Sequence, residues 1–217
     1  MNTPGKWVVV RVDGKIASVS KDYSGLSDTA KILASKKNLE YKEIHANVVS
    51  DEEIWRLRES VSLEDLILFG SPFRKKIWEA LFSLTHPQEY TTDEGIEISP
   101  GTRMMSYSDF AQYCGCPAGA RAVAHAVGMN PLPVLIPCHL IVPKETMDRI
   151  RELRRNAEQT LFKGEDLFPF RKLDYGEYAL GRDLKRDLVR REIHCISFPA
   201  AARCKSPLGC LLIARLR

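Results

Sequence analysis

Apolar and polar positions alternate at the start of the chain, and this alternation predicts a β-hairpin. It covers residues 7–20 and is centred on Asp13-Gly14, a dipeptide that favours the tight turn between antiparallel strands. Helical spacing follows near residues 27–37 and again over 51–60, the second segment after a serine that suits an N-cap. We therefore expect residues 1–70 to form a small α/β domain.

From residue 72 onward the pattern becomes helical, because apolar residues recur on one face of a helix. These residues are Phe73, Ile77, Trp78 and Leu81. Residues 85–98 are mostly polar and predict a loop. The apolar run Val134–Ile136 lies between prolines and predicts a short buried strand.

Two short helices are expected between these segments. The first, over about 107–114, follows a capping-box pattern in which Asp109 stands three residues after Ser106. Gly115 ends it, and a second helix over 117–127 has proline in its first turn. Two short helices joined by so tight a turn are typical of a helix-turn-helix.

Two amphipathic helices are expected later in the chain. The first has apolar residues on one face and arginines around it: Ile150, Leu153, Ala157 and Leu161, with Arg149, Arg151, Arg154 and Arg155. We interpret the arginines as a solvated face, with an added DNA-backbone contact as the alternative. The second helix, over 181–192, turns Leu184, Leu188 and Val189 inward, and residues 195–217 form a tail to which we assign no function.

Composition narrows the class of protein. The chain has 217 residues, of which 44% are hydrophobic and 28% charged, as in soluble globular proteins. No apolar run reaches the length of a membrane span, and the N-terminus lacks the apolar core of a secretion signal, so we expect an intracellular protein without a membrane partner. Its six cysteines should then be reduced, and Cys114 and Cys116 lack the second pair that a structural zinc site needs.

Charge is distributed unevenly along the chain. Residues 1–70 carry 10 basic and 11 acidic side chains, so the remaining 147 residues carry 22 of the 32 basic and 17 of the 28 acidic ones. The net charges of the two parts are therefore −1 and +5. A basic second part is compatible with binding a phosphate backbone, and equally with an ordinary solvated surface.

Cys138 and His139 form the most prominent candidate for chemistry. They follow the predicted strand Val134–Ile136, which would carry them to its end. Thiol chemistry requires a thiolate, and an adjacent imidazole is a common means of producing one near neutral pH. A buried structural cysteine beside a surface histidine is the alternative for such a pair.

The residues around this pair resemble a known family signature. The matching stretches are Gly70–Phe73, Ile77–Leu81, Ser106–Ala111, Gly115–Val123, Asn130-Pro131 and Ile136–His139, followed by Tyr178, Gly181, Leu184-Lys185 and Glu192. Their types and order are similar to those of the O6-alkylguanine-DNA alkyltransferases, the methylated-DNA–protein-cysteine methyltransferases.

The resemblance implies an α/β N-terminal domain plus a mainly α C-terminal domain, over 71–194, with a helix-turn-helix (winged-helix-like) DNA-binding motif. Residues 143–175 then form an insertion where the family has a short loop. The implied function is single-turnover DNA repair, in which a methyl group passes from O6-methylguanine in duplex DNA to Cys138 without a cofactor. The implied partner is double-stranded DNA containing O6-alkylguanine, bound by a monomer.

The resemblance also implies roles for individual residues. Cys138 would be the nucleophile, His139 a general base acting through a water, and Glu192 the partner that holds the imidazole tautomer. Asn130 would brace the turn before the active-site segment. From sequence alone, Glu192 could instead be a solvated helix residue, and Asn130 part of an ordinary turn.

DNA contacts are implied for the two short helices. Arg121 matches the arginine finger that replaces a flipped-out nucleotide, and its small neighbours Ala120 and Ala122 would let the helix approach the minor groove closely. Tyr107 matches the tyrosine that assists rotation of the nucleotide and contacts the flipped guanine. Close helix packing, with Arg121 in solvent, is the alternative.

Three departures from the family pattern concern the active site. Leu140 replaces the arginine that usually follows Pro-Cys-His. Ala179 stands where a serine often donates to guanine O6, and Leu180 where glycine is common at the pocket wall. Loss of a donor should slow transfer, and a bulkier wall should narrow the pocket.

Two rival functions fit parts of the pattern. An alkyltransferase-like protein would bind the lesion without transfer, but those relatives typically lack the cysteine. A Cys-His-Glu thiol hydrolase would need an oxyanion site, which the sequence does not locate, and would leave the helix-turn-helix unexplained.

Overall fold

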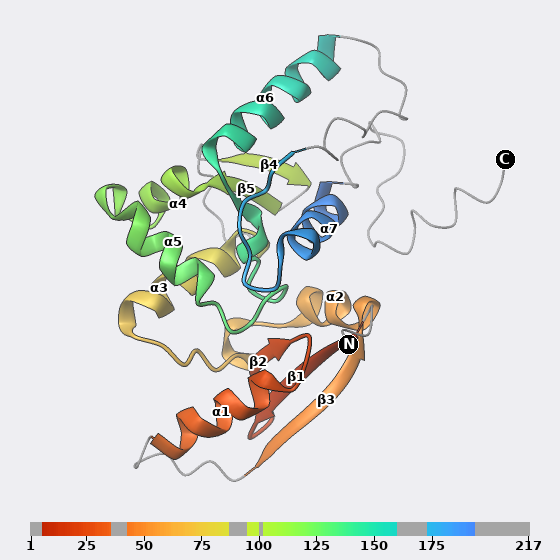
Figure 1. The fold of residues 1–217 in the computed structure, drawn as a ribbon, viewed down its shortest axis with the longest axis vertical. Coiled ribbons are helices and arrows are strands. Elements are labelled where there is room, and N and C mark those ends of the chain that lie inside the picture. Colours follow the sequence, from red (N-terminus) through yellow and green to blue (C-terminus); the bar gives the residue numbers. More distant parts are fainter. Residues whose placement is uncertain (1–5, 36–42, 87–94, 100–101, 160–172, 194–217) are drawn as a thin grey trace, which may run out of the picture.

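The fold is described here from a computed structural model that covers residues 6–35, 43–86, 95–99, 102–159 and 173–193. Figure 1 shows an N-terminal sheet with helix α1 on one side, and a second group of helices around a smaller sheet. Helix α2 lies between these two groups.

The N-terminal sheet has the strand order β2-β1-β3, with both pairs antiparallel. The N-terminal group consists, in chain order, of β1 Lys6–Val12, β2 Lys15–Ser20, α1 Ser24–Ser35, β3 Ile44–Ser50 and α2 Asp51–Ser60. The predicted hairpin is confirmed, and its turn places Asp13 and Gly14 at φ 47° and 81°, a region that aspartate and glycine tolerate. The two predicted helices are confirmed with small shifts at their ends, and Ser50 caps α2 by accepting from the Glu53 amide.

Strand β3 was not predicted from the sequence. It pairs with β1 over its whole length but lies at the sheet edge, where Ile44 and Val48 stay 39% and 48% exposed. The side chains of β3 therefore bury little apolar surface, and the strand is held mainly by its pairing with β1.

The C-terminal group consists of short elements around a core that includes α3. In chain order they are η1 Leu63–Asp65, α3 Pro72–Ser83, β4 Ile96–Ser99, β5 Thr102–Ser106, α4 Tyr107–Tyr113, η2 Pro117–Gly119, α5 Ala120–Gly128, η3 Cys138–Leu140, β6 Ile141–Val142, α6 Lys144–Gln159 and α7 Arg182–Ile193. The predicted helices over 72–81, 107–114 and 181–192 are therefore present.

Trp78 joins α3 to α5 at the centre of this group. Its indole is 1% exposed, and Nε1 donates to the Ala126 carbonyl at 2.8 Å. A Cβ on Gly70 would lie 2.7 Å from the ring, so only glycine lets the preceding segment pass this close. This packing fixes the position of α5, which forms one wall of the candidate site.

Two strand predictions need correction. Val134–Ile136 is not a strand: Val134 has φ 73°, strained for a β-branched residue, and the segment folds back so that Pro133 and Ile136 bridge. Within the predicted loop 85–98, β4 pairs with β5, because long-range pairing outweighs a polar local sequence. Residues 87–94 of that loop lie outside the described chain.

Helix α6 confirms the amphipathic helix predicted around residue 150. Met147 and Ile150 are buried, whereas Arg149 pairs with Glu152 and Arg151 pairs with Asp148 and Asp109. These pairs agree with a solvated, ion-paired face. The side chains of residues 154–159, the predicted face residue Leu161 and the tail 195–217 lie outside the described part.

Within the described ranges, no helix has both the length and the apolar character needed to cross a membrane. The same ranges hold no cluster of His, Cys, Asp and Glu side chains arranged as metal ligands.

Candidate active site

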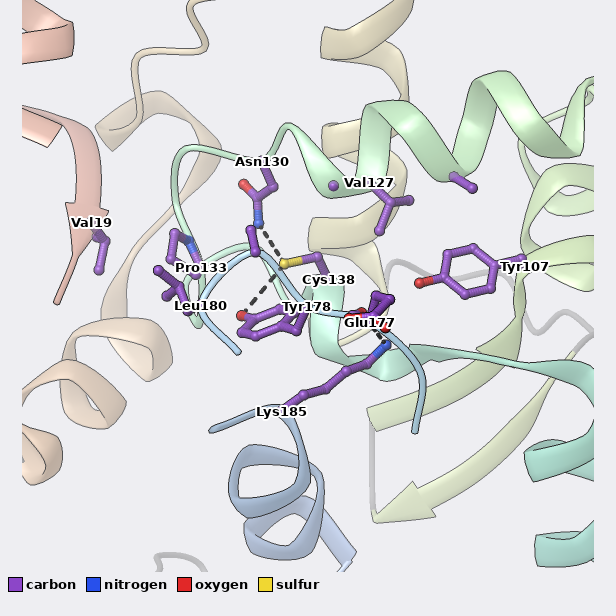
Figure 2. A pocket seen from close by; sticks show the side chains of 13 residues that line it. Val19, Tyr107, Val127, Asn130, Pro133, Cys138, Glu177, Tyr178, Leu180 and Lys185 are labelled. Atoms are coloured by element: carbon purple, nitrogen blue, oxygen red, sulfur yellow. Dashed lines mark hydrogen bonds between the residues drawn. The ribbon is translucent and has the colours of Figure 1, made fainter. Parts of the chain in front are cut away.

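A cavity of about 390 Å³ lies beside Cys138 and draws its walls from distant parts of the chain. Val19 of β2, Tyr107 of α4 and Val127 of α5 contribute to it, together with Asn130, Pro133 and the segment 177–180. Figure 2 shows the Cys138 sulfur among these side chains, with Tyr107 and Tyr178 pointing their hydroxyl groups into the same space.

Asn130 fixes the turn that carries Cys138. Its Nδ2 donates to the Ile136 carbonyl at 2.7 Å and to Cys138 Sγ at 3.1 Å, while its Oδ1 accepts from the Leu132 amide at 3.0 Å. One side chain therefore ties both ends of the strained Val134 turn to the thiol (Figure 2). The structure brings Asn130 and Cys138 into direct contact.

The environment of Cys138 keeps its thiol protonated at rest. Burial raises the pKa of Cys138, and hydrogen bonds with Asn130 and Tyr178 and the charge of Lys185 oppose this only in part. The thiol donates to Tyr178 Oη, with the sulfur and oxygen 3.7 Å apart. A nucleophilic role for this cysteine therefore requires a base.

His139 is a buried, neutral imidazole whose tautomer is fixed by Glu192. Its Nε2 lies 2.9 Å from Glu192 Oε1, and burial lowers the pKa of His139 although the Glu192 carboxylate opposes this. With Nε2–H donating to the carboxylate, Nδ1 holds the free electron pair. Nδ1 is buried and has no hydrogen-bond partner among the described residues, so it is available to accept a proton.

Glu192 is buried rather than solvated, and it is ionised. Burial raises the pKa of Glu192, but the charge of Arg58 and the hydrogen bonds from His139 and Arg58 outweigh burial and lower it to about 2. The Arg58 Nη1 donates directly to the same carboxylate. Arg58 was not predicted as a site residue; its only signal in the sequence is its position four residues after Ile54, on the buried face of α2.

Lys185 is a second buried cation; it stands in the matching signature, but no role was predicted for it from the sequence. It is fully buried, and Nζ donates to the Ile141 carbonyl at 2.8 Å and the Glu177 carbonyl at 3.4 Å. Burial lowers the pKa of Lys185 to about 8, against the opposing charges of Cys138, Asp174 and Glu177. Its sequence signal is its spacing from Leu188 and Val189, which places a charge on the apolar face of α7.

The predicted pocket residues do line the cavity. Tyr107, Ala179 and Leu180 all contribute to its walls, and Leu180 is half-buried. Leu140, the departure next to His139, is fully buried in the core and does not line the cavity.

Three of the four predicted DNA-contact residues lie on α5, whereas the fourth, Tyr107, lies on α4 and lines the cavity. Arg121 and Ala122 are exposed, and Ala120 is half-buried. None of the three lines the cavity. Ala124 and Val127 of the same helix do line it, so α5 connects the exposed surface around Arg121 to the wall beside Cys138.

The N-terminal sheet takes part in building the site. Val19 lines the cavity, and its amide donates to the Pro131 carbonyl at 2.9 Å, next to Asn130. Arg58 reaches the other side of the site from α2. The active-site turn is thus supported by backbone and side chain from the N-terminal group.

Residues 72–165 match a family model described as 6-O-methylguanine DNA methyltransferase, DNA binding domain. The chain is 35% identical over 80 residues to a probable methylated-DNA–protein-cysteine methyltransferase of Acanthamoeba polyphaga mimivirus, which is 37% of this chain and 44% of the viral protein. It is 34% identical over 77 residues to the constitutive methylated-DNA–protein-cysteine methyltransferase of Bacillus subtilis, covering 36% of this chain and 38% of the bacterial one. The matches thus span less than half the length of these curated relatives.

The fold is also similar to a solved structure. The O6-methylguanine-DNA methyltransferase of Pyrococcus kodakaraensis strain KOD1 aligns with a TM-score of 0.50 and 20% identity, covering 88% of this chain and 94% of that one. This similarity extends the common fold beyond the segment that the family model matches.

Proposed function

We propose that this protein repairs O6-methylguanine in duplex DNA by transferring the methyl group to its own Cys138, because residues 72–165 match the 6-O-methylguanine DNA methyltransferase family model. Each molecule then acts once, since nothing in the site can cleave a thioether. The observation that carries the proposal is the buried Cys138 thiol, held by Asn130 beside a cavity, next to a neutral His139 whose Nδ1 is free. We further expect a monomer that acts inside the cell.

The proposed transfer is a nucleophilic displacement at the methyl carbon. The Cys138 thiol passes its proton through a water to His139 Nδ1, and Glu192 stabilises the resulting imidazolium. The thiolate attacks the methyl group, an S–C bond forms, and the C–O6 bond breaks with its electron pair going to guanine. Guanine then takes up a proton, so the products are guanine and S-methylcysteine.

The target base must leave the duplex before it can reach this thiol. We interpret α4 and α5 as a helix-turn-helix in which α5 lies against the DNA. Arg121 would occupy the vacated space, and Ala120 and Ala122 would allow close approach to the minor groove. The exposure of Arg121 and Ala122 supports this, as does the continuity of α5 with the cavity wall.

Labelled methyl transfer separates this function from its rivals. When duplex DNA carrying O6-[methyl-³H]methylguanine is mixed with intact protein, we expect the label to move to the protein until every molecule holds one methyl group. An alkyltransferase-like protein would bind this DNA and leave the label in place. A thiol hydrolase would leave the DNA unchanged and instead turn over an ester or amide substrate.

The pocket wall predicts a preference for small alkyl groups. Leu180 lines the cavity with a branched side chain, and a benzyl ring needs volume there that a methyl group does not. We therefore expect reaction with O6-methylguanine DNA and poor reaction with O6-benzylguanine. Leu180→Gly should recover the benzyl substrate selectively, by about 10-fold or more, as expected when a pocket gains the volume of several methylene groups.

Ala179→Ser is the matched control at the neighbouring position. It adds a donor near the leaving oxygen and should therefore accelerate both substrates instead of one. The single-turnover rates of the two variants on both substrates provide the measurement. Equal consumption of both substrates by the unmodified protein would mean that Leu180 does not limit the pocket.

A further inference from the structure

Arg58 forms an ion pair with Glu192 at the junction of the N-terminal and C-terminal groups. Both side chains are only 7% exposed, and the two residues are 134 positions apart in the sequence. Glu192 Oε1 is also the atom that His139 Nε2 contacts at 2.9 Å. Arg58, Glu192 and His139 thus form one continuous chain of buried polar groups.

Packing around Arg58 is specific. Its guanidinium lies 4.7 Å from the centre of the Trp55 ring, and Arg191 lies at the same distance from that ring. Trp55 in turn packs edge-on against the His139 ring, with centroids 6.3 Å apart. The backbone carbonyl of Arg58 is 3.0 Å from His86 Nε2, which fixes this turn of α2.

Burial of a charged pair in such a place requires a reason beyond stability. Removing two charges from water costs about as much as their attraction returns, so buried pairs add little net stability. Methyl transfer to Cys138 uses Glu192 and His139, but it does not itself require a cation on the far side of the Glu192 carboxylate.

We propose that Arg58 is a positioning residue that keeps the His139–Glu192 pair free of an extra proton, so that His139 Nδ1 can accept the proton of Cys138. This inference rests on the proposed transfer to Cys138. With Arg58 in place, the carboxylate has a permanent countercharge, and a neutral imidazole completes a group of zero net charge. Without Arg58, the same buried carboxylate attracts a proton to itself or to His139, and a base that already holds a proton cannot take another.

The other charges near this pair do not replace Arg58. His86 contacts the backbone carbonyl of Arg58, Cys138 precedes His139 in the chain, and Lys185 and Arg191 belong to the same helix as Glu192. Lys185 donates to the Ile141 and Glu177 carbonyls, and none of the ion pairs found between described residues involves Arg191. Strands β4 and β5 pack near α7 and η3. They place Glu97 opposite Arg103, so the negative and positive charges of these two residues offset each other.

The test compares Arg58→Met with the unmodified protein across pH. An opposite charge at this distance moves a pKa by about 1–3 units, so the pH of half-maximal methyl-transfer rate should rise by about one unit or more in the variant. The rate near neutral pH should fall as this midpoint moves up toward and past neutrality, and it should recover at alkaline pH. A purely structural role would instead lower the rate equally at every pH.

Two further variants guard against a simple folding defect. Arg58→Lys retains the charge and should keep the midpoint close to that of the unmodified protein. Arg191→Met removes the other cation that lies against the Trp55 ring and should also leave the midpoint nearly unchanged. An equal shift in Arg191→Met, or no shift in Arg58→Met, overturns the proposal.

A readout independent of transfer separates this inference from the proposed function. The ring ¹⁵N shifts of His139, assigned by comparison with His139→Gln, distinguish a neutral imidazole from a protonated one. At neutral pH we expect a neutral ring in the unmodified protein and a proton added to the His139–Glu192 pair in Arg58→Met, with Glu192→Gln in the same chain returning the ring to neutral. If the unmodified protein transfers no methyl group, the proposed function fails, while these shifts still decide the role of Arg58.

Discussion

Replacement of Cys138 by serine is expected to abolish methyl transfer and to leave binding of the methylated duplex intact. A serine hydroxyl is far less acidic than a thiol, and a neutral histidine cannot generate an alkoxide in this site. Loss of a nucleophile that acts as one unit with its base lowers rates by on the order of 10⁴-fold or more. Single-turnover transfer and a binding titration with the same DNA provide the two measurements.

The other described cysteines supply matched controls. Cys114 is buried and Cys116 half-buried, and neither lines the cavity. Serine at Cys116 should leave transfer unchanged, and serine at Cys114 should change stability more than rate. If transfer persists in Cys138→Ser but disappears in either control variant, Cys138 is not the nucleophile.

Arg121→Ala should separate duplex repair from reaction with the free base. If Arg121 fills the space of the flipped nucleotide, its loss returns an unstacking cost of a few kcal/mol to the reaction, on the order of 10²-fold in rate on duplex DNA. Free O6-methylguanine needs no flipping, so its slower reaction should change little. Arg149→Ala, at an exposed and ion-paired arginine of α6, controls for the loss of one positive charge.

The ratio of the two losses is what decides the role of Arg121. A much larger loss on the duplex supports insertion into the stack. Equal losses on duplex and free base would mean that Arg121 supports the fold of α5 and takes no part in flipping.

Local patterns predicted much of the fold because each depends on neighbouring residues. The turn at Asp13-Gly14 and the cap at Ser50 are of this kind, and both are present. Elements that depend on distant partners were missed or misassigned. Strand β3 needs β1, and the Val134 turn is held by the hydrogen bonds that Asn130 donates and accepts, in place of strand pairing.

The candidate site divides in the same way. Cys138 and His139 are adjacent, and the family resemblance supplied Glu192, which lies 53 positions from His139. No role was predicted for Arg58 or Lys185, because charged residues are normally exposed, and only the packed structure shows that both are buried. No local pattern connects Arg58 to a carboxylate 134 positions away.

The most direct measurement of the central claim is the location of the transferred methyl group. Protein should be incubated with an equimolar duplex containing one O6-methylguanine, digested, and analysed by peptide mass spectrometry. We predict one added methyl group per molecule, on the peptide that contains Cys138 and on its sulfur. A methyl group on Cys114 or Cys116, or its absence from the protein while the methylated duplex still binds, would contradict the account.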